Sequence, residues 1–177
     1  MNGSIVKRNR AAAAIAAAVA FLSMAASAMA QAPAGSGSAR LPEKPLMVGH
    51  RGAAGLLPEN TLAAFRRGCE LGIDAIELDL LMSADGQLVV HHDFRLKPET
   101  ARTADGAWIG SGPPPAVNAL SLAQIKAYDV GRLRPNTSYA ARYPEQAPVD
   151  GEPIPTSKEP IDLVKQPCRP PTRLVDQ

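Results

Sequence analysis

Aromatic and cysteine residues are scarce in this chain. Its 177 residues include only three Tyr, three Phe and one Trp. The sequence therefore offers no aromatic-rich loop, and it shows no clear apolar helix of the kind that docks on a membrane surface. Cys69 and Cys168 are the only cysteines. They could pair in an exported chain, but the sequence alone does not place them together.

A basic surplus is also absent once the N-terminus is set apart. The formal net charge of +2 includes Lys7, Arg8 and Arg10. Without residues 1–30, 16 basic residues face 17 acidic ones, a net charge of −1. The basic balance therefore belongs to the N-terminus, and nothing in the charge pattern indicates a nucleic-acid-binding surface.

The N-terminus has the order of a secretory signal peptide. Residues 1–10 carry three basic side chains and no acid, residues 11–22 are apolar without a break, and residues 28–30 read Ala-Met-Ala. This order predicts cleavage after Ala30 and an exported chain, periplasmic or secreted. An uncleaved anchor is the alternative, but the stretch is mostly alanine and short of the ~20 strongly apolar residues of a span. We expect no stable membrane span after cleavage.

The remaining chain divides into a linker and one domain. Residues 31–45 contain "APAGSGSA", which is typical of a flexible linker, and residues 46–177 form the expected domain. About 147 residues remain after cleavage, fewer than the ~200 that a closed eight-fold barrel of strands and helices usually takes. Of the 17 prolines, 13 lie from Pro98 onward. Residues 98–155 are therefore expected to form a long loop, apart from one helix capped by Ser121. Such a loop is either a functional cover or disordered.

A strand, a loop and a helix are expected before residue 73. Residues 46–48 are apolar and end at Gly49, which predicts a short buried strand. Asn60 or Thr61 is a good N-cap for the apolar helical stripe that follows. Gly72 suits the left-handed position at the end of that helix.

The next stretch, "IDAIELDLLMSADGQLVVHHDF", changes to a period of two. Glu77 and Asp79 therefore project from the same side of a strand. Asp85-Gly86 is a strong two-residue turn signal, and a hairpin closed there sets His92 opposite Asp79. A barrel of strands and helices would instead prefer parallel strands, so the strand direction stays open at this stage.

The charged residues allow two interpretations each. Two carboxylates on one buried strand face need a cationic partner, either Arg or Lys side chains or a hard divalent cation such as Mg²⁺ or Ca²⁺. His50 could be a hydrogen-bonded loop residue or a catalyst, and His91 and His92 are equally ambiguous alone. Together, these residues make a site that could bind an anion, hold a metal and move protons.

This combination of charges suits a phosphodiester. Attack on a phosphodiester brings negative charge toward negative charge, so a divalent metal and a guanidinium speed its hydrolysis. Two titratable groups can then serve the nucleophile and the leaving group. Arg51 offers the planar fork that matches phosphate oxygens, which explains its place beside His50 at the end of a strand.

Several motifs also resemble a known family. The stretches "GHRGAAGLLPENTLAAF", "GIDAIELDLLMSADGQLVVHHDF" and "PIPTSKEPIDLV" are similar to the glycerophosphodiester phosphodiesterase family, whose pattern is His-Arg-Gly, Pro-Glu-Asn-Thr, Glu-x-Asp, Asp-Gly and His-Asp in that order. The resemblance covers residues 46–164 and is most specific up to Asp93. Five ordered motifs at fitting distances are much stronger than any one of them.

The resemblance implies a fold, an activity and a site. The fold is an α/β (β/α)8 TIM-barrel type, of which this chain would hold only the first part. The activity is metal-dependent hydrolysis of glycerophosphodiesters to glycerol 3-phosphate and an alcohol, as a phosphoric diester hydrolase of lipid and glycerol metabolism. Carried over by motif, His50 and His92 are the general acid/base pair, Arg51 contacts the phosphate, and Glu77 and Asp79 bind Ca²⁺ or Mg²⁺. Glu59 and Asn60 are read first as shaping the loop and capping the helix.

The chain also departs from the family pattern. The family has a further metal-binding glutamate in a Glu-x-Lys motif on a strand after "IPT", but no such motif is present near "RLVDQ", and Asp176 fits it poorly. Pro160 and Pro167 fall where a regular helix is expected, and Pro160 is tolerable only at its start. The alternatives are therefore a non-catalytic truncated remnant or phosphoanion-binding module, and a phospholipase acting on intact lipid.

Overall fold

The computed structural model describes residues 45–110, 112–165 and 173–176. The expected signal peptide (1–30) and all of the expected linker except Pro45 lie outside the described residues, as do Pro167 and Cys168. Within the described part of the chain, no helix combines the length and the apolar character that crossing a membrane takes. Cys69 is buried and disulfide-bonded.

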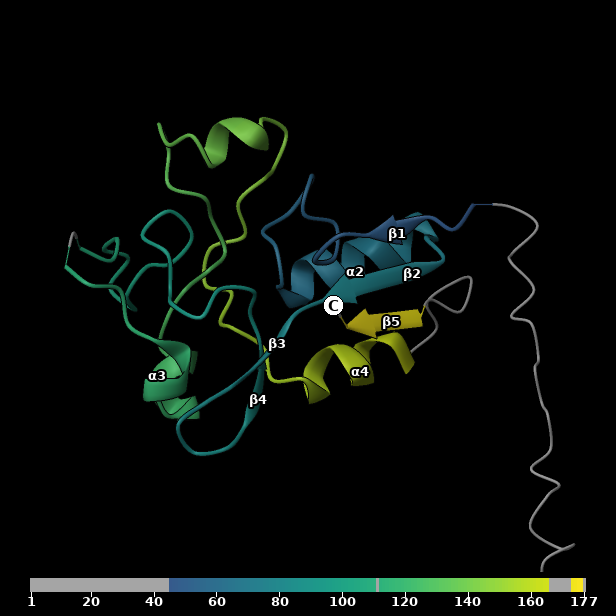
Figure 1. The fold of residues 1–177 in the computed structure, drawn as a ribbon. Helices are drawn as coiled ribbons and strands as arrows, with labels where there is room; N and C mark the ends of the chain where they lie inside the picture. The colour runs from purple at the N-terminus through teal and green to yellow at the C-terminus, as the bar shows by residue number, and fades with distance from the viewer. Residues whose placement is uncertain (1–44, 111, 166–172, 177) are drawn as a thin grey trace, which may run out of the picture. The chain divides into compact units, whose positions relative to one another are not determined.

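A three-stranded parallel sheet has the order β1-β2-β5 (Figure 1). Its strands are β1 (Val48–Gly49), β2 (Ala75–Leu78) and β5 (Arg173–Asp176). Helix α2 (Leu62–Leu71) connects β1 to β2, and helix α4 (Lys158–Lys165) precedes β5. Parallel neighbours joined through helices are the repeating unit of α/β folds.

Helix α2 forms where the sequence predicts it. The side chain of Thr61 caps its first turn by accepting a hydrogen bond from the backbone N–H of Ala64 at 3.2 Å. Gly72 ends the helix in the left-handed conformation, with φ of 68°. Phe65 and Cys69 lie on the buried face of the helix, so the predicted caps and the predicted stripe are confirmed.

The burial predicted for residues 46–48 is wrong. Leu46 is 50% exposed, Met47 is 64% exposed and Val48 is 49% exposed. Val48 opens β1 at the edge of the sheet, where β2 is its only partner among the described strands, and Leu46 and Met47 precede that strand. An apolar run identifies a strand, but it does not say how many neighbours cover that strand.

Of the two strand directions that the sequence leaves open, the structure has the hairpin, as a separate two-stranded sheet with β3 (Leu80–Met82) antiparallel to β4 (Leu88–Val90). The predicted register is wrong by one residue, because the loop has three residues rather than two. The backbone N–H of Ser83 donates to the carbonyl of Gln87 at 2.9 Å. Of the loop residues, only Gly86 has a positive φ, whereas a two-residue type I′ turn requires two. His91 therefore lies opposite Asp79, with its N–H 3.0 Å from the Asp79 carbonyl.

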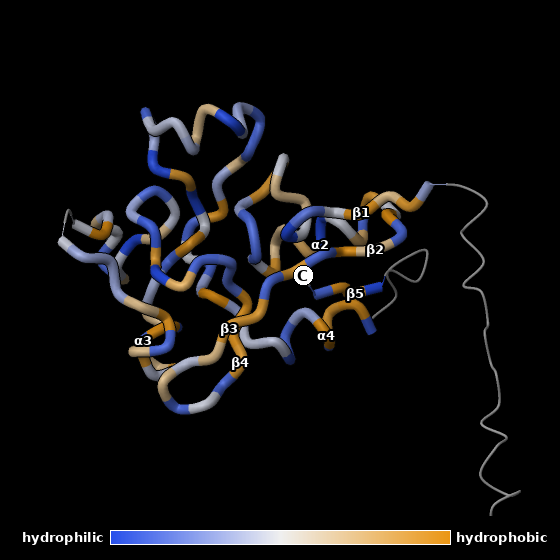
Figure 2. The backbone as a smooth tube through the Cα atoms, viewed as in Figure 1, coloured by the Kyte–Doolittle hydropathy of each residue, from blue (hydrophilic) through white to orange (hydrophobic). Residues whose placement is uncertain are grey.

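Two hydrophobic clusters hold the described residues together. The first packs the sheet against α2 and α4, and adjacent residues of β4 point into different clusters, Val90 into the first and Val89 into the second. Figure 2 shows the hydrophobic stretches where β3 and β4 run side by side. The fully or nearly fully buried members of the first cluster are Phe65, Cys69, Ile73, Ile76, Leu78 and Val90, and those of the second are Val89, Leu96, Ala101, Val117, Ile125, Val130 and Ile154.

Residues 98–110 and 112–155, the described part of the segment 98–155, are ordered around the second cluster, so the disorder alternative is wrong for them. The segment contains the 3₁₀ helix η1 (Val117–Ala119), the helix α3 (Leu122–Lys126) and the 3₁₀ helix η2 (Ala140–Arg142). Ser121 caps α3 as predicted, in a capping box with Gln124.

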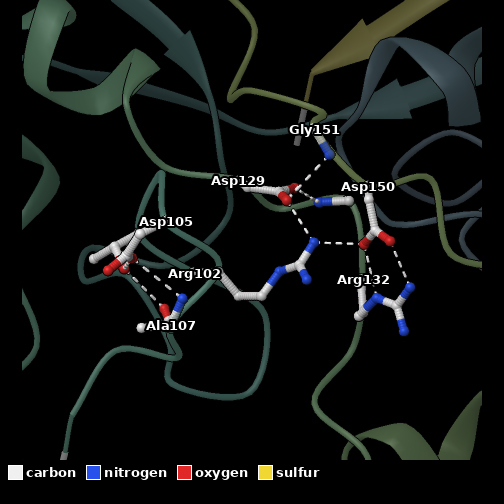
Figure 3. A network of polar contacts seen from close by, with 9 residues as sticks. Arg102, Asp105, Ala107, Asp129, Arg132, Asp150 and Gly151 are labelled. Atoms are coloured by element: carbon white, nitrogen blue, oxygen red, sulfur yellow. Dashed lines mark hydrogen bonds and ion pairs between the residues drawn. The ribbon is translucent and has the colours of Figure 1, made fainter.

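A network of ion pairs connects distant parts of this segment (Figure 3). Arg102 Nη2 lies 2.5 Å from a carboxylate oxygen of Asp129 and 2.5 Å from one of Asp150. Arg132 binds the same Asp150 carboxylate with both Nε, at 2.7 Å, and Nη2, at 2.5 Å. The Asp129 carboxylate also accepts from the backbone N–H groups of Gly131 and Gly151. Residues about 20 to 50 positions apart are joined in this way without a regular strand or helix.

Pro160 is the third residue of α4. At that position its missing N–H is one that the first turn leaves unbonded in any helix, so the residue is compatible with a regular start. Glu159 accepts from the backbone N–H and the hydroxyl of Thr156 at 2.6 and 2.7 Å, and from Lys126 at 2.6 Å. The helix start is therefore also tied to α3.

Candidate active site

The site begins where β1 and β2 end. Parallel strands bring their carboxyl ends to the same edge of a sheet. His50 and Arg51 directly follow β1, Glu77 lies in β2, and Asp79 directly follows β2. The backbone N–H of Arg51 donates to Glu77 Oε2 at 2.6 Å, and that of Gly52 donates to the Glu77 carbonyl at 3.1 Å. The loop after β1 is therefore fixed to β2.

The Arg51 guanidinium lies between two carboxylates. Its Nη1 is 2.9 Å from Glu59 Oε1, and its Nε is 3.4 Å from Asp79 Oδ2. Burial acts to lower the pKa of Arg51, but Glu59 and then Asp79 outweigh burial and raise it. Arg51 is therefore a permanently charged group in a nearly buried position.

Glu77 and Asp79 share one face, as the period of two predicts. Their neighbours Ile76 and Leu78 point into the first hydrophobic cluster on the opposite face. Both carboxylate residues are buried. Asn60 Nδ2 donates to Asp79 Oδ2 at 2.9 Å. The structure thus brings Arg51, Glu77 and Asp79 together: the Arg51 guanidinium is paired with Asp79, and its backbone N–H donates to Glu77.

Two buried oxygens at this point have no hydrogen-bond partner among the described residues. They are Glu77 Oε1 and Asn60 Oδ1. A buried, unpaired carboxylate oxygen is costly, and carboxylate and amide oxygens are the ligands that Ca²⁺ and Mg²⁺ prefer. The donor set therefore fits a hard cation. No group of three or more His, Cys, Asp or Glu side chains that could hold a metal occurs in the described residues.

The two expected catalytic histidines lie at the surface of this region. His50 is exposed and lines a pocket of about 320 Å³ together with Gly52, Leu56 and Tyr143. His92 has a side chain that is 40% exposed, and its Nδ1 lies 3.3 Å from Asp93 Oδ1. In the described part of the chain, no hydrogen bond or ion pair joins either imidazole to Glu77 or Asp79.

Asp93 connects His92 to a cation. Lys97 Nζ lies 2.6 Å from Asp93 Oδ2. Burial acts to raise the pKa of Asp93, but Lys97 and then His92 outweigh it and lower the pKa. Asp93 is therefore an ionised partner that can orient the His92 ring.

His91 has a different environment from His92. It is buried, and its Nε2 has no hydrogen-bond partner among the described residues. Burial lowers the pKa of His91, so this ring is neutral near pH 7. His91 is buried whereas the His92 side chain is 40% exposed, so the two adjacent rings lie in different surroundings.

Three side chains of this region were missed or misread from the sequence. Asn60 binds Asp79 rather than capping α2. Glu59 holds Arg51, and the hydroxyl of Tyr139 donates to the other oxygen of the Glu59 carboxylate. The Pro-Glu-Asn-Thr motif was the available signal for Glu59 and Asn60, whereas no sequence pattern points to Tyr139.

Comparison with known proteins decides the family. The model of the glycerophosphoryl diester phosphodiesterase family matches residues 50–169, which is more than half of the chain. The chain belongs to this family. The match includes every residue assigned to the site, from His50 to His92.

Relatives support the same family membership. A glycerophosphodiester phosphodiesterase of Caldanaerobacter subterraneus subsp. tengcongensis is 38% identical over 121 residues, which are 68% of this chain and 41% of the relative. One of Bacillus subtilis (strain 168) is 36% identical over 124 residues, 68% of this chain and 36% of the relative. The chain therefore spans less than half the length of the glycerophosphodiester phosphodiesterases that it matches.

Solved structures of the family share the fold. A Silicibacter pomeroyi DSS-3 protein assigned as a glycerophosphoryl diester phosphodiesterase superposes with a TM-score of 0.67 at 35% identity, covering 76% of this chain and 47% of that one. An Oleispira antarctica phosphodiesterase, solved with the product sn-glycerol-3-phosphate, gives a TM-score of 0.50 at 28% identity, covering 75% and 45%. The expected α/β fold of the (β/α)8 barrel type, present here in part, is confirmed.

Proposed function

We propose that this protein hydrolyses glycerophosphodiesters to glycerol 3-phosphate and an alcohol. The observation that carries the proposal is the meeting of Arg51, from the loop after β1, with Glu77, in β2, and Asp79, directly after β2. A permanently charged guanidinium beside the buried Asp79, with the buried Glu77 bonded to the Arg51 backbone N–H, suits a phosphate ester and a cation at one place. The family membership and a family structure solved with sn-glycerol-3-phosphate support the same substrate class.

In this proposal Glu77 and Asp79 hold Ca²⁺ or Mg²⁺. The unpaired Glu77 Oε1 and the nearby unpaired Asn60 Oδ1 support this role. When bound, the cation supplies positive charge that offsets the negative charge developing on the phosphate. Arg51 binds phosphate oxygens with the N–H groups that Glu59 leaves available.

His50 and His92 are the proposed acid/base pair. One imidazole accepts a proton from the attacking water, and the other donates a proton to the departing alcohol oxygen. The exposure of both rings allows proton exchange with solvent, and Asp93 holds one nitrogen of His92. The pocket beside His50 is mostly lined by small and apolar residues, so it has room for a substrate group without a charge.

The activity test uses the purified chain with glycerophosphocholine and Ca²⁺ or Mg²⁺. We expect release of glycerol 3-phosphate, a strong decrease on chelation, and a loss of about 10²- to 10⁴-fold in kcat for His50→Ala, the usual effect of removing a general acid or base. Arg67→Ala is the control, because Arg67 forms an exposed ion pair with Glu70 on α2. Turnover that survives both the chelator and His50→Ala excludes the proposed chemistry.

A phosphoanion-binding module is the second candidate. It is favoured by the small number of acids at the site, because the described residues hold no group of three or more possible metal ligands. This candidate predicts no turnover, while Arg51→Ala still weakens the binding of glycerol 3-phosphate in calorimetry. Turnover that depends on His50 excludes it.

We also propose that the protein is exported, to the periplasm or outside the cell. The basic, apolar and Ala-Met-Ala order of residues 1–30 supports this proposal. The intact mass of the exported protein should correspond to a chain that begins at Gln31. A mature chain that keeps Met1 contradicts it.

A further inference from the structure

Glu59 uses both of its carboxylate oxygens in specific contacts. Glu59 Oε1 accepts from Arg51 Nη1 at 2.9 Å, and Glu59 Oε2 accepts from the hydroxyl of Tyr139. Tyr139 is 80 positions away in the sequence and precedes η2 in the segment 98–155. One carboxylate therefore connects that segment to the arginine at the centre of the site.

Tyr139 is well placed to hold this carboxylate. Its side chain is buried, with 8% exposure. Lys97 Nζ lies 5.1 Å from the centre of its ring, and the guanidinium carbon of Arg142 lies 4.3 Å from it, both within the range of cation–π contacts. Burial, and then the hydrogen bond to Glu59, raise the pKa of Tyr139, so its hydroxyl remains a donor.

The segment is docked by other contacts as well. Gln146 Nε2 donates to the carbonyl of Ala54 at 2.7 Å, and the N–H of Ala147 donates to the carbonyl of Leu56 at 2.9 Å. These bonds hold the segment against the loop that follows β1. Loss of the Tyr139 hydroxyl alone should therefore leave the segment in place.

The Arg51 guanidinium needs a contact that fixes its orientation, because carboxylates lie near it on Glu59 and on Asp79. Its Nε lies 3.4 Å from Asp79 but is buried without a hydrogen-bond partner among the described residues. A guanidinium has five N–H donors, and the Glu59 contact uses one of them on Nη1. If Glu59 moves, the guanidinium loses its hydrogen bond on Nη1 and is free to turn further toward Asp79.

We propose that Tyr139 is a positioning residue for Arg51, which it orients through Glu59 so that the free guanidinium N–H groups face the phosphate. The inference rests on the proposed phosphate contact of Arg51. It makes the segment 98–155 a part of the site, in addition to the loops that directly follow β1 and β2.

The kinetic and binding test compares Tyr139→Phe with Tyr128→Phe. Both variants lose one hydroxyl, but Tyr128 packs against the second hydrophobic cluster. We expect Tyr139→Phe to weaken glycerol 3-phosphate binding about 10-fold and to raise KM for glycerophosphocholine similarly, with a smaller change in kcat, because one charge-assisted hydrogen bond is lost. In a Glu59→Gln background the same substitution should have no further effect, whereas additive effects contradict an action through Glu59.

A second measurement does not depend on turnover. In spectra of protein labelled with ¹⁵N-arginine, we expect a slowly exchanging Arg51 Nε–H signal in the wild type and in Tyr128→Phe. This signal should broaden or exchange faster in Tyr139→Phe and in Glu59→Gln. An unchanged Arg51 signal in Tyr139→Phe overturns the inference. A protein that shows the expected Arg51 changes but does not bind glycerol 3-phosphate overturns the proposed function and leaves the positioning role supported.

Discussion

Two successive residues after β1 adopt a left-handed backbone. Arg51 has φ of 49° and Gly52 has φ of 88°. This turn aims both N–H groups at Glu77, one at its carboxylate and one at its carbonyl. At the scale of single residues, the position of Arg51 is therefore set by its backbone, held by the Glu77 carboxylate and carbonyl, before its own guanidinium contributes.

Gly52→Ala should disturb this geometry. A Cβ at position 52 would lie 2.8 Å from the Cβ of Ala64, and the positive φ disfavours any side chain. We expect a loss of at least about 1–2 kcal/mol in the free energy of unfolding, measured with urea. Gly55→Ala is the matched control, because a Cβ there meets nothing within 4 Å. Equal stability of both variants contradicts the described approach of the loop to α2.

Some residues of the site can be predicted from the sequence, and others cannot. The shared face of Glu77 and Asp79 follows from the period of a strand, which is a local property. Asn60 was misread because Asn and Thr are both good caps, and only the three-dimensional position of Asp79 decides between them. The contact of Tyr139 with Glu59 cannot be predicted from the sequence, because the two residues lie 80 positions apart.

At the scale of elements, the segment 98–155 depends on the ion pairs of Figure 3. The bidentate hydrogen bond from Arg132, and then Arg102, lower the pKa of Asp150 to about 2. A lowered pKa in the folded state stabilises folding above the ordinary value near 3.8, and this contribution is lost as the pH falls through about 2.

Arg132→Gln should raise the pKa of Asp150 toward its ordinary value. We expect the ¹³Cγ shift of Asp150 to stay at its ionised value between about pH 5 and about pH 3 in the wild type, and to titrate within that range in the variant. Arg66→Gln, on α2, should behave as the wild type. If Asp150 titrates normally in the wild type, the described pairing does not form in solution.

The sequence indicates a hairpin at this place, but not its correct register. The turn signal at Asp85-Gly86 favours a hairpin whereas a barrel favours parallel strands, and the structure has two antiparallel strands. The register was wrong because a three-residue loop, with the Ser83 hydroxyl accepting from Gln87 N–H at 2.9 Å and donating to Asp85 at 2.6 Å, competes with the two-residue turn. Side-chain hydrogen bonds of this kind are not visible in the pattern of apolar residues.

At the scale of the whole molecule, the parallel sheet has an exposed edge at β1 in the described residues. Val48 in this strand, and Leu46 and Met47 directly before it, are apolar and about half exposed or more. Exposed apolar edge strands favour pairing with other chains.

We therefore expect concentration-dependent association, which Met47→Lys should reduce. Sedimentation velocity over a range of protein concentrations measures it, and Ile161→Lys is the control, because Ile161 is also exposed but lies on α4. Association that is insensitive to Met47→Lys, or absent from the wild type, shows that this edge does not pair.

The contacts that hold Arg51 join distant parts of the chain. Glu59 and Tyr139 are 80 positions apart, and Ala54 and Gln146 are 92 positions apart. Closing such long loops is entropically costly, and native pairings of high sequence separation form late and slowly. On a growing polypeptide, Arg51 leaves the ribosome well before the residues that immobilise it. The guanidinium should therefore acquire its final orientation only in the last stages of folding.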